Sequence, residues 1–402
     1  MLESPLKLPC GATLSNRIAK ASMSEQLAHL DRSPSSEMLR LYERWGASGA
    51  ALLLSGHVMI DAQRLSEAGN VAIDDERHLV ALRSWARAGR GEGAHFMLQL
   101  NHPGRQVPRT LDSAPVAPSP VPLKVGAKAF APPRALTEAE IEDIIQRFAR
   151  TAAVTEKAGF SGVQIHAAHG YLISQFLSPL TNQRRDDWGG DAKRRRRFLE
   201  AIVGAVRQKV GAEFAVSVKL NSADFQRGGI TEEESLGVIE ALGDQKVDLL
   251  EVSGGTYERA MMFEEAVADS TRQREAFFLD FTEKARRVAN MPLMLTGGFR
   301  TRRGMEEALA SGAVDVIGMA RPFAVEPELP QALLEGSKNS ATPVRLATGL
   351  KTLDSMLTGA WHQAQLQRMG RGKEPKLSLS RAGAMWLYAR DALKNGRKAR
   401  GV

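Results

Sequence analysis

Residues 159–191 read GFSGVQIHAAHGYLISQFLSPLTNQRRDDWGGD, and this stretch decides the fold. It opens with a short apolar run, Gly162–His166, of the kind expected for a strand buried on both faces. Polar residues follow where the run ends, and an amphipathic stretch follows them. A buried strand, a polar turn and a helix together form the repeating unit of an α/β protein.

The same unit recurs along most of the chain. Eight strands are expected, at Ile18–Ala21, Ala51–Ser55, His95–Leu100, Gly162–His166, Phe214–Leu220, Asp248–Ser253, Pro292–Thr296 and Asp315–Met319. Helices are expected between them, at Ser35–Ala47, Glu76–Gly89, Thr137–Ala158, Ala192–Val210, Thr231–Leu242, Arg274–Ala289 and Arg302–Ala310. Eight strands that alternate with helices favour a closed (β/α)₈ TIM barrel over an open sheet.

Two segments interrupt the alternation. Residues 101–135 are rich in proline and predict a hairpin or an ordered loop over one barrel mouth, after the third strand. From about Thr342 the pattern is helical and basic, beyond the eighth repeat. We therefore expect one catalytic barrel domain, residues 1–340, followed by a C-terminal helical extension, residues 341–402.

The net positive charge comes from that extension. The 402 residues hold 54 Lys and Arg against 46 Asp and Glu, a formal charge of +8. Residues 366–402 alone hold ten basic and two acidic side chains, so the rest of the chain is balanced. The basic run Lys193–Arg197 has acidic neighbours, which favours a salt-bridged helix surface. The charge therefore gives no reason to expect a nucleic-acid partner.

Cysteine content and hydropathy exclude other classes of protein. The single cysteine, Cys10, excludes an intrachain disulfide, an iron–sulfur cluster and a cysteine-based zinc site. No run reaches the ~18 apolar residues of a membrane span. The start, MLESPLKLPCG, lacks the basic and apolar regions of a secretory signal. We expect a cytoplasmic protein that does not bind a membrane.

The chemistry of a barrel enzyme lies at the C-terminal ends of its strands. Gly297 and Gly298 follow the seventh expected strand, and Arg321 follows the eighth. Glycines there let backbone N–H groups approach a phosphate, and an arginine can bind phosphate oxygens with two donors. The alternative is a pair of ordinary turns with an exposed arginine.

Three further residues at strand ends are candidates for a role in binding or catalysis. His166 and His169 could bind a metal, donate to a substrate oxygen or simply pack in the barrel mouth. No third ligand is evident, so we expect no metal. Lys219 is a lone cation in an apolar strand, which indicates either a fixed negative partner or a side chain that reaches solvent.

The ordered set of strand ends resembles that of the old yellow enzyme family of FMN-dependent ene-reductases. The resemblance runs from about Leu6 to about Pro330. It rests on residues 159–191 together with LPCGATLSNRIAKASMSE, SVKLNSADF, LLEVSGGTYE, LTGGF and VIGMARPF, in that order. It implies a single barrel that holds FMN at its C-terminal mouth and takes hydride from NADH or NADPH. Relatives with an added iron–sulfur domain need cysteines that this chain lacks.

The resemblance also implies roles for individual residues. FMN would be held non-covalently by Ser22, Met23, Ser24, Gly56, Gln99, Lys219, Gly298, Phe299, Ala320 and Arg321. The last four would bind the phosphate, Gln99 the pyrimidine edge, and Lys219 would lie near N1 and O2 of the flavin. His166 and His169 would bind the carbonyl oxygen of the substrate, and Tyr171 would be the proton donor.

The implied reaction is a ping-pong reduction of an electron-poor alkene. Hydride would reach the β-carbon of an α,β-unsaturated carbonyl compound, and Tyr171 would protonate the α-carbon. Two residues depart from the family pattern. Ser24 lies where relatives often carry Cys or Thr, and Gln26 lies where some relatives carry Tyr. The sequence leaves three questions open. They are the physiological substrate, the choice between NADH and NADPH, and whether the extension forms a homo-oligomer.

Two other functions are weighed against this one. A tRNA-dihydrouridine synthase would use the same cofactor, but it needs a catalytic cysteine where this chain has HAAHGY, residues 166–171. A non-enzymatic binding barrel would contain no flavin and would be colourless when purified.

Overall fold

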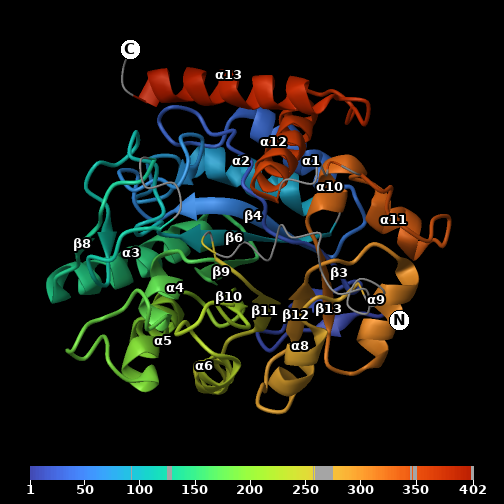
Figure 1. Cartoon of the computed structure of the whole chain (residues 1–402). Helices are drawn as coiled ribbons and strands as arrows, with labels where there is room; N and C mark the ends of the chain where they lie inside the picture. Colours follow the sequence, from blue (N-terminus) through green and yellow to red (C-terminus); the bar gives the residue numbers. More distant parts are fainter. Residues whose placement is uncertain are drawn as a thin grey trace.

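Eight parallel strands close into a barrel, so the predicted (β/α)₈ fold is confirmed (Figure 1). They are β3 (Ile18–Lys20), β4 (Leu52–Met59), β6 (His95–Asn101), β9 (Gly162–Ala167), β10 (Ala215–Asn221), β11 (Leu249–Ser253), β12 (Leu293–Thr296) and β13 (Val316–Met319). The sheet closes because β3 pairs with both β13 and β4. This computed structural model describes all residues except 92, 125–128, 257, 259–274, 345, 347–350 and 400–402, and no side chains in 351–356 and 391–399.

Helices follow the strands and cover the outside of the barrel. They are α1 (Ser36–Gly46), α2 (Leu79–Arg90), α3 (Glu138–Lys157), α5 (Ala192–Lys209), α6 (Glu232–Asp244), α8 (Leu279–Arg286) and α9 (Arg302–Ala310), with shorter helices α4 (Leu172–Leu177), α10 (Arg321–Val325) and α11 (Leu329–Leu334). Capping boxes at Thr137 and Thr231 start α3 and α6, where helix starts were expected. The helix expected from Arg274 begins at Leu279 instead, and Arg274 lies outside the described residues.

A hairpin at the start of the chain packs against the interior of the barrel. Its strands, β1 (Leu6–Lys7) and β2 (Thr13–Leu14), pair antiparallel. Leu8 and Leu14 are buried in one apolar cluster with strand residues such as Leu52. A cluster of this kind fills the barrel with side chains, which leaves the polar groups to gather at the other ends of the strands.

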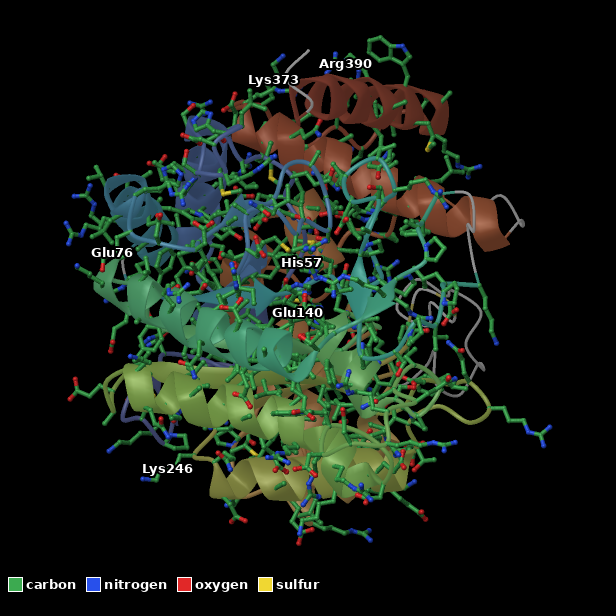
Figure 2. The ribbon with its side chains drawn as sticks, turned by 90° about the vertical axis from the view of Figure 1, so that its left-hand side faces the viewer. His57, Glu76, Glu140, Lys246, Lys373 and Arg390 are labelled. Carbon is green, nitrogen blue, oxygen red and sulfur yellow. The ribbon has the colours of Figure 1, made fainter. Side chains whose placement is uncertain are left out.

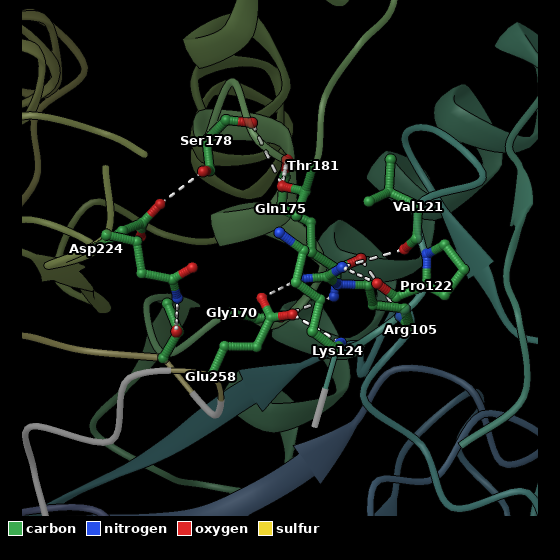
Figure 3. A network of polar contacts seen from close by, with 12 residues as sticks. Arg105, Val121, Pro122, Lys124, Gly170, Gln175, Ser178, Thr181, Asp224 and Glu258 are labelled. Carbon is green, nitrogen blue, oxygen red and sulfur yellow. Dashed lines mark hydrogen bonds and ion pairs between the residues drawn. The ribbon is translucent and has the colours of Figure 1, made fainter. Parts of the chain in front are cut away.

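The proline-rich excursion after β6 is ordered in its described part, and Pro108 and Phe130 form an isolated antiparallel bridge within it. Its two short strands, β7 (Val116–Ala117) and β8 (Arg134–Ala135), pair in parallel. Arg105 anchors it: one guanidinium nitrogen donates to the carbonyl oxygens of Val121 (3.1 Å) and Pro122 (2.9 Å). Another forms a 2.8 Å ion pair with Glu258, beyond β11 (Figure 3).

The strand β4 is longer than predicted because it contains a bulge. The expected strand ended at Ser55, but β4 continues to Met59 and pairs further with β5 (Val71–Ala72). Its register against β6 shifts between Leu54 and His57. A bulge turns the side chains beyond it in a new direction, and here it directs His57 toward the barrel mouth.

The C-terminal extension packs onto the barrel. It contains α12 (Lys351–Gly370) and α13 (Arg381–Ala399), which lie together above β4 in Figure 1. The helix α12 packs against α1 and α10. Trp361 is 1% exposed and donates its indole N–H to the Leu379 carbonyl, and Gln363 donates to the backbone carbonyl of Glu25. The boundary near residue 341 stays a prediction.

Candidate active site

A cavity of about 440 Å³ lies at the C-terminal ends of the barrel strands. This volume is within the usual range for cofactor and small-molecule sites. Ten of the thirteen predicted site residues line it: Ser22, Met23, Ser24, His169, Tyr171, Lys219, Gly298, Phe299, Ala320 and Arg321. The candidate site therefore lies at the C-terminal ends of the strands, where barrel enzymes carry their chemistry.

The other three predicted residues do not belong to the cavity wall. The Gly56 N–H donates to the Glu25 carboxylate at 2.7 Å, and a Cβ at Gly56 would lie 2.2 Å from that side chain. Gln99 and His166 are almost fully buried, at 0% and 1% exposure. Each still contacts residues of the wall: Gln99 accepts a 2.9 Å hydrogen bond from Ser22, and His166 packs beside His169.

A chain of polar side chains crosses the barrel beneath the cavity. Ser22 donates to Gln99, and Gln99 donates to Gln164 at 2.7 Å. Gln164 donates to one carboxylate oxygen of Glu251 at 2.8 Å, and the other oxygen lies 2.8 Å from Lys219 Nζ. Each of these groups is oriented by the next, so Ser22 and Lys219 hold fixed positions in the cavity wall.

Four aromatic rings form a cluster at one side of the cavity. His166 lies 5.1 Å from His169, 5.0 Å from Tyr171 and 5.3 Å from His57, measured between ring centroids. The His57 ring meets Tyr171 edge-on at 4.8 Å, and Figure 2 shows His57 in the interior of the molecule. The cluster brings together all three residues that were predicted to act on the substrate.

The histidines of this cluster are neutral near pH 7. Burial lowers the pKa values of His166 and His169 well below the ordinary value, and the nearby Lys219 adds to this effect. Burial likewise lowers the pKa of His57 to about 3. The Ala168 N–H donates to His166 Nδ1 at 3.3 Å. The single proton of the neutral His166 ring therefore lies on Nε2, which can donate a hydrogen bond.

The turn that carries His169 and Tyr171 is held by Gln175, as Figure 3 shows. His169 has φ of 61°, in the left-handed region that non-glycine residues rarely adopt. Gln175 donates to the carbonyl oxygens of Gly170 (2.8 Å) and Pro103 (3.2 Å). These bonds join the loops after β6 and β9, so the strained turn keeps one conformation.

The wall beyond β12 and β13 has the features of a phosphate site. Gly298 has φ of 88°, and a Cβ there would lie 2.0 Å from the Glu275 carbonyl oxygen, so only glycine fits. Arg300 and Arg321 line the same wall. The buried hydroxyl of Thr296 has no hydrogen-bond partner among the described residues. An anionic ligand with polar ring atoms would satisfy these groups, and FMN fits that description.

Sequence reasoning missed three parts of the site. His57 lies just beyond the strand expected at Ala51–Ser55, and the bulge that directs it to the cavity leaves no clear sequence pattern. Glu67, from the segment between β4 and β5, lines the cavity and has no motif around it. Residues of α12 and α13, among them His362, Gln363 and Tyr388, also contribute to the wall, although they follow the last barrel strand.

Two kinds of feature are absent from the described residues. Within them, no group of three or more His, Cys, Asp or Glu side chains is arranged to hold a metal ion. In the same part of the chain, no helix combines the length and apolar character needed to cross a membrane.

Comparison with known proteins gives one consistent result. The profile of the NADH:flavin oxidoreductase / NADH oxidase family matches residues 2–339. NADH-dependent flavin oxidoreductase iliE of Hypocrea jecorina (strain QM6a) is 39% identical over 355 residues, covering 82% of this chain and 88% of iliE. NADPH dehydrogenase of Geobacillus sp. (strain WCH70) is 30% identical over 337 residues, covering 83% and 93%. The solved structure of the old yellow enzyme homologue from Zymomonas mobilis superposes with a TM-score of 0.72 at 27% identity, covering 85% and 95%.

Proposed function

Because the chain belongs to the NADH:flavin oxidoreductase / NADH oxidase family, we propose that it reduces the carbon–carbon double bond of an electron-poor alkene. The protein is an FMN-dependent oxidoreductase that uses NADH or NADPH. Its proposed substrates are α,β-unsaturated carbonyl compounds. The ring cluster of His57, His166, His169 and Tyr171 beside the cavity carries this proposal.

The cavity wall divides into a cofactor side and a substrate side. On the cofactor side, Ser22, Met23, Ser24 and Lys219 would hold the flavin ring, and Gly298, Phe299, Ala320 and Arg321 its phosphate. Bound FMN supplies the chemistry of two-electron hydride transfer. Gln99 would act from beneath the wall, where it already orients Ser22.

On the substrate side, the histidines are neutral. A neutral histidine can donate a hydrogen bond to a carbonyl oxygen, whereas a charged histidine would be costly in this buried site. His166 Nε2 carries a proton that can be donated without creating a buried charge. A donor on the carbonyl oxygen withdraws electron density from the conjugated β-carbon and stabilises the negative charge that develops on the oxygen. We assign this role to His169 in the cavity wall together with His166, which packs against it from the layer beneath.

Tyr171 is the proposed proton donor to the α-carbon. Its side chain is 3% exposed and lines the cavity beside the two histidines. A phenol holds its proton firmly at neutral pH and releases it to a carbon that has gained electron density. The burial keeps bulk water from competing for that step.

The test is a half-reaction experiment on the purified holoenzyme. After reconstitution with FMN, the protein should show flavin absorbance bands that bleach under anaerobic NADH or NADPH. Adding 2-cyclohexenone should restore the bands and yield cyclohexanone, whereas cyclohexanone itself, the control, should restore nothing. An enzyme that is reduced by NAD(P)H but reoxidised only by oxygen would refute alkene reduction.

A further inference from the structure

Glu67 reaches the cavity from the segment between β4 and β5 and is held there by three donors. Ser24 Oγ donates to one carboxylate oxygen, which also accepts from Asn70 Nδ2 at 3.4 Å. Gln26 Nε2 donates to the other oxygen at 2.9 Å. Gln26 does so from a left-handed backbone conformation, with φ of 54°. The two residues that depart from the family pattern, Ser24 and Gln26, thus converge on one carboxylate.

No basic side chain that the structure describes balances the charge of Glu67. It forms no ion pair with any residue that the structure describes, and it is the one carboxylate among the described residues of the cavity wall. Lys219, the cation on β10, is paired with Glu251. Burial raises the pKa of the Glu67 carboxyl, and the nearby Glu25 raises it further. A cation beside Glu67 would relieve both effects.

Hydrogen bonds connect Glu67 to the substrate side of the cavity. Asn70 joins it to Ser66, whose hydroxyl donates to Asn70 Oδ1 at 2.9 Å. Because that hydroxyl proton is used, His57 Nδ1, 3.3 Å from Ser66 Oγ, must be the donor of its own bond. The His57 ring in turn contacts Tyr171. The carboxylate therefore belongs to the wall where the two reactants would alternate.

We propose that Glu67 is the site in this cavity that recognises the positively charged nicotinamide ring of NAD⁺ or NADP⁺. This inference rests on the proposed function. When the reductant reacts, the C4–H bond of the dihydronicotinamide breaks, and its hydrogen leaves with the electron pair to the flavin as the acceptor. The nicotinamide ring is left with one positive charge, and no solvent proton enters that step. A carboxylate beside the ring stabilises the charge as it forms.

The other reactant gains nothing from this carboxylate. An unsaturated ketone is neutral, and negative charge develops on its oxygen during reduction, so a nearby carboxylate would oppose the change. Glu67 therefore distinguishes two reactants that share one cavity. Ser24, Gln26 and Asn70 are positioning residues in this arrangement, because they act through the orientation of the carboxylate.

The test compares two flat ligands that differ in charge. N1-methylnicotinamide is a cation with the ring of NAD⁺, and nicotinamide is its neutral counterpart. Their dissociation constants are measured on the holoenzyme from the perturbation of flavin absorbance. Wild type should bind the cation more tightly than the neutral ring, and Glu67→Gln should weaken binding of the cation about tenfold while changing that of nicotinamide little. Reduction of Glu67→Gln by NADH should slow more than its reoxidation by enone.

Two variants keep the test decisive. Glu67→Asp retains the charge and should retain the preference for the cation. Asp224→Asn is the matched control, since it removes a buried carboxylate that does not line the cavity and does not act on Glu67, and it should keep the wild-type ratio. Equal binding of the two ligands by wild type, or equal weakening of both in Glu67→Gln, would overturn the proposal. Failure of the proposed function would show separately, as holoenzyme that enones do not reoxidise.

Discussion

Lys219 Nζ lies 2.8 Å from Glu251 Oε1, and the two residues are direct partners in the register of β10 and β11. Their side chains are 5% and 0% exposed. The sequence left two readings of Lys219, a fixed negative partner or a side chain that reaches solvent, and the first is confirmed. The pair leaves Lys219 in the cavity wall while its charge is compensated from below.

Removing the cation should leave Glu251 as a buried, uncompensated charge. We expect Lys219→Met to lower the free energy of unfolding by about 3–5 kcal/mol and to weaken FMN binding. Urea unfolding and flavin fluorescence measure the two effects. The double variant Lys219→Met with Glu251→Gln should recover much of the stability but not the FMN affinity. A single variant as stable as wild type would show that the pair is not coupled to folding.

Tyr171→Phe should separate the two half-reactions. The substitution keeps the ring that packs against His57 and His166 and removes the hydroxyl group that carries the proton. Loss of a positioned proton donor costs about 10²–10⁴-fold in rate, so reoxidation by 2-cyclohexenone should slow by that order in stopped-flow experiments. Reduction by NADH serves as the internal control and should change little. Equal slowing of both steps would contradict the assigned role.

The buried histidines should make the fold sensitive to mild acid. Burial lowers the pKa of His102 to about 3, whereas the unfolded side chain titrates near the ordinary histidine pKa of 6.5. Below about pH 6.5 the unfolded state then binds one more proton at this residue, so stability falls as the pH falls, by about 1.4 kcal/mol per unit. His57, with a pKa lowered to about 3, adds to the same slope.

His102→Asn tests this dependence. Asparagine keeps an acceptor for the Gly104 N–H, which donates to His102 Nδ1 at 3.1 Å. Urea unfolding at pH 7, 6 and 5 should show a slope reduced by about 1.4 kcal/mol per unit, the contribution of one proton. An unchanged slope would mean that His102 titrates normally in the folded protein.

Truncation at Thr342 should reduce FMN affinity as well as charge. The helix α12 lines the cavity and contacts α1, so its removal opens the wall and exposes apolar surface. The dissociation constant for FMN, measured by fluorescence, should rise at least tenfold. Gln363→Ala in the full chain is the milder variant, since it keeps α12 in place and removes one side chain of the wall with its hydrogen bond to the Glu25 carbonyl. Unchanged FMN binding after truncation would show that the barrel alone forms the cofactor site.

Sequence patterns predicted the barrel well because each strand and helix is decided locally. All eight expected strands are present, and the capping residues Thr137 and Thr231 start helices where expected. The strand-end rule then located most of the cavity wall. It could not predict that the Gly56 N–H is hydrogen-bonded to Glu25 instead of facing the cavity. Nor could it predict that Gln99 and His166 lie one layer beneath the cavity wall.

The residues that sequence reasoning missed reach the site through long-range contacts. His57 depends on a register shift between two strands, which no periodicity reveals. Glu67 depends on Ser24 and Gln26, more than forty positions earlier in the chain. His362 and Gln363 depend on where a helix docks after the barrel has ended. Each is a property of tertiary packing rather than of local sequence.

The placement of α12 over the mouth also sets an order of events during synthesis. All eight barrel strands precede Lys351–Gly370 in the chain, so the barrel strands are synthesised before the helix that supplies one wall of the cavity. Domains generally fold as units while the chain is still growing. Here the helix that completes the cavity wall is synthesised last, so the complete cofactor pocket exists only after translation has passed Gly370.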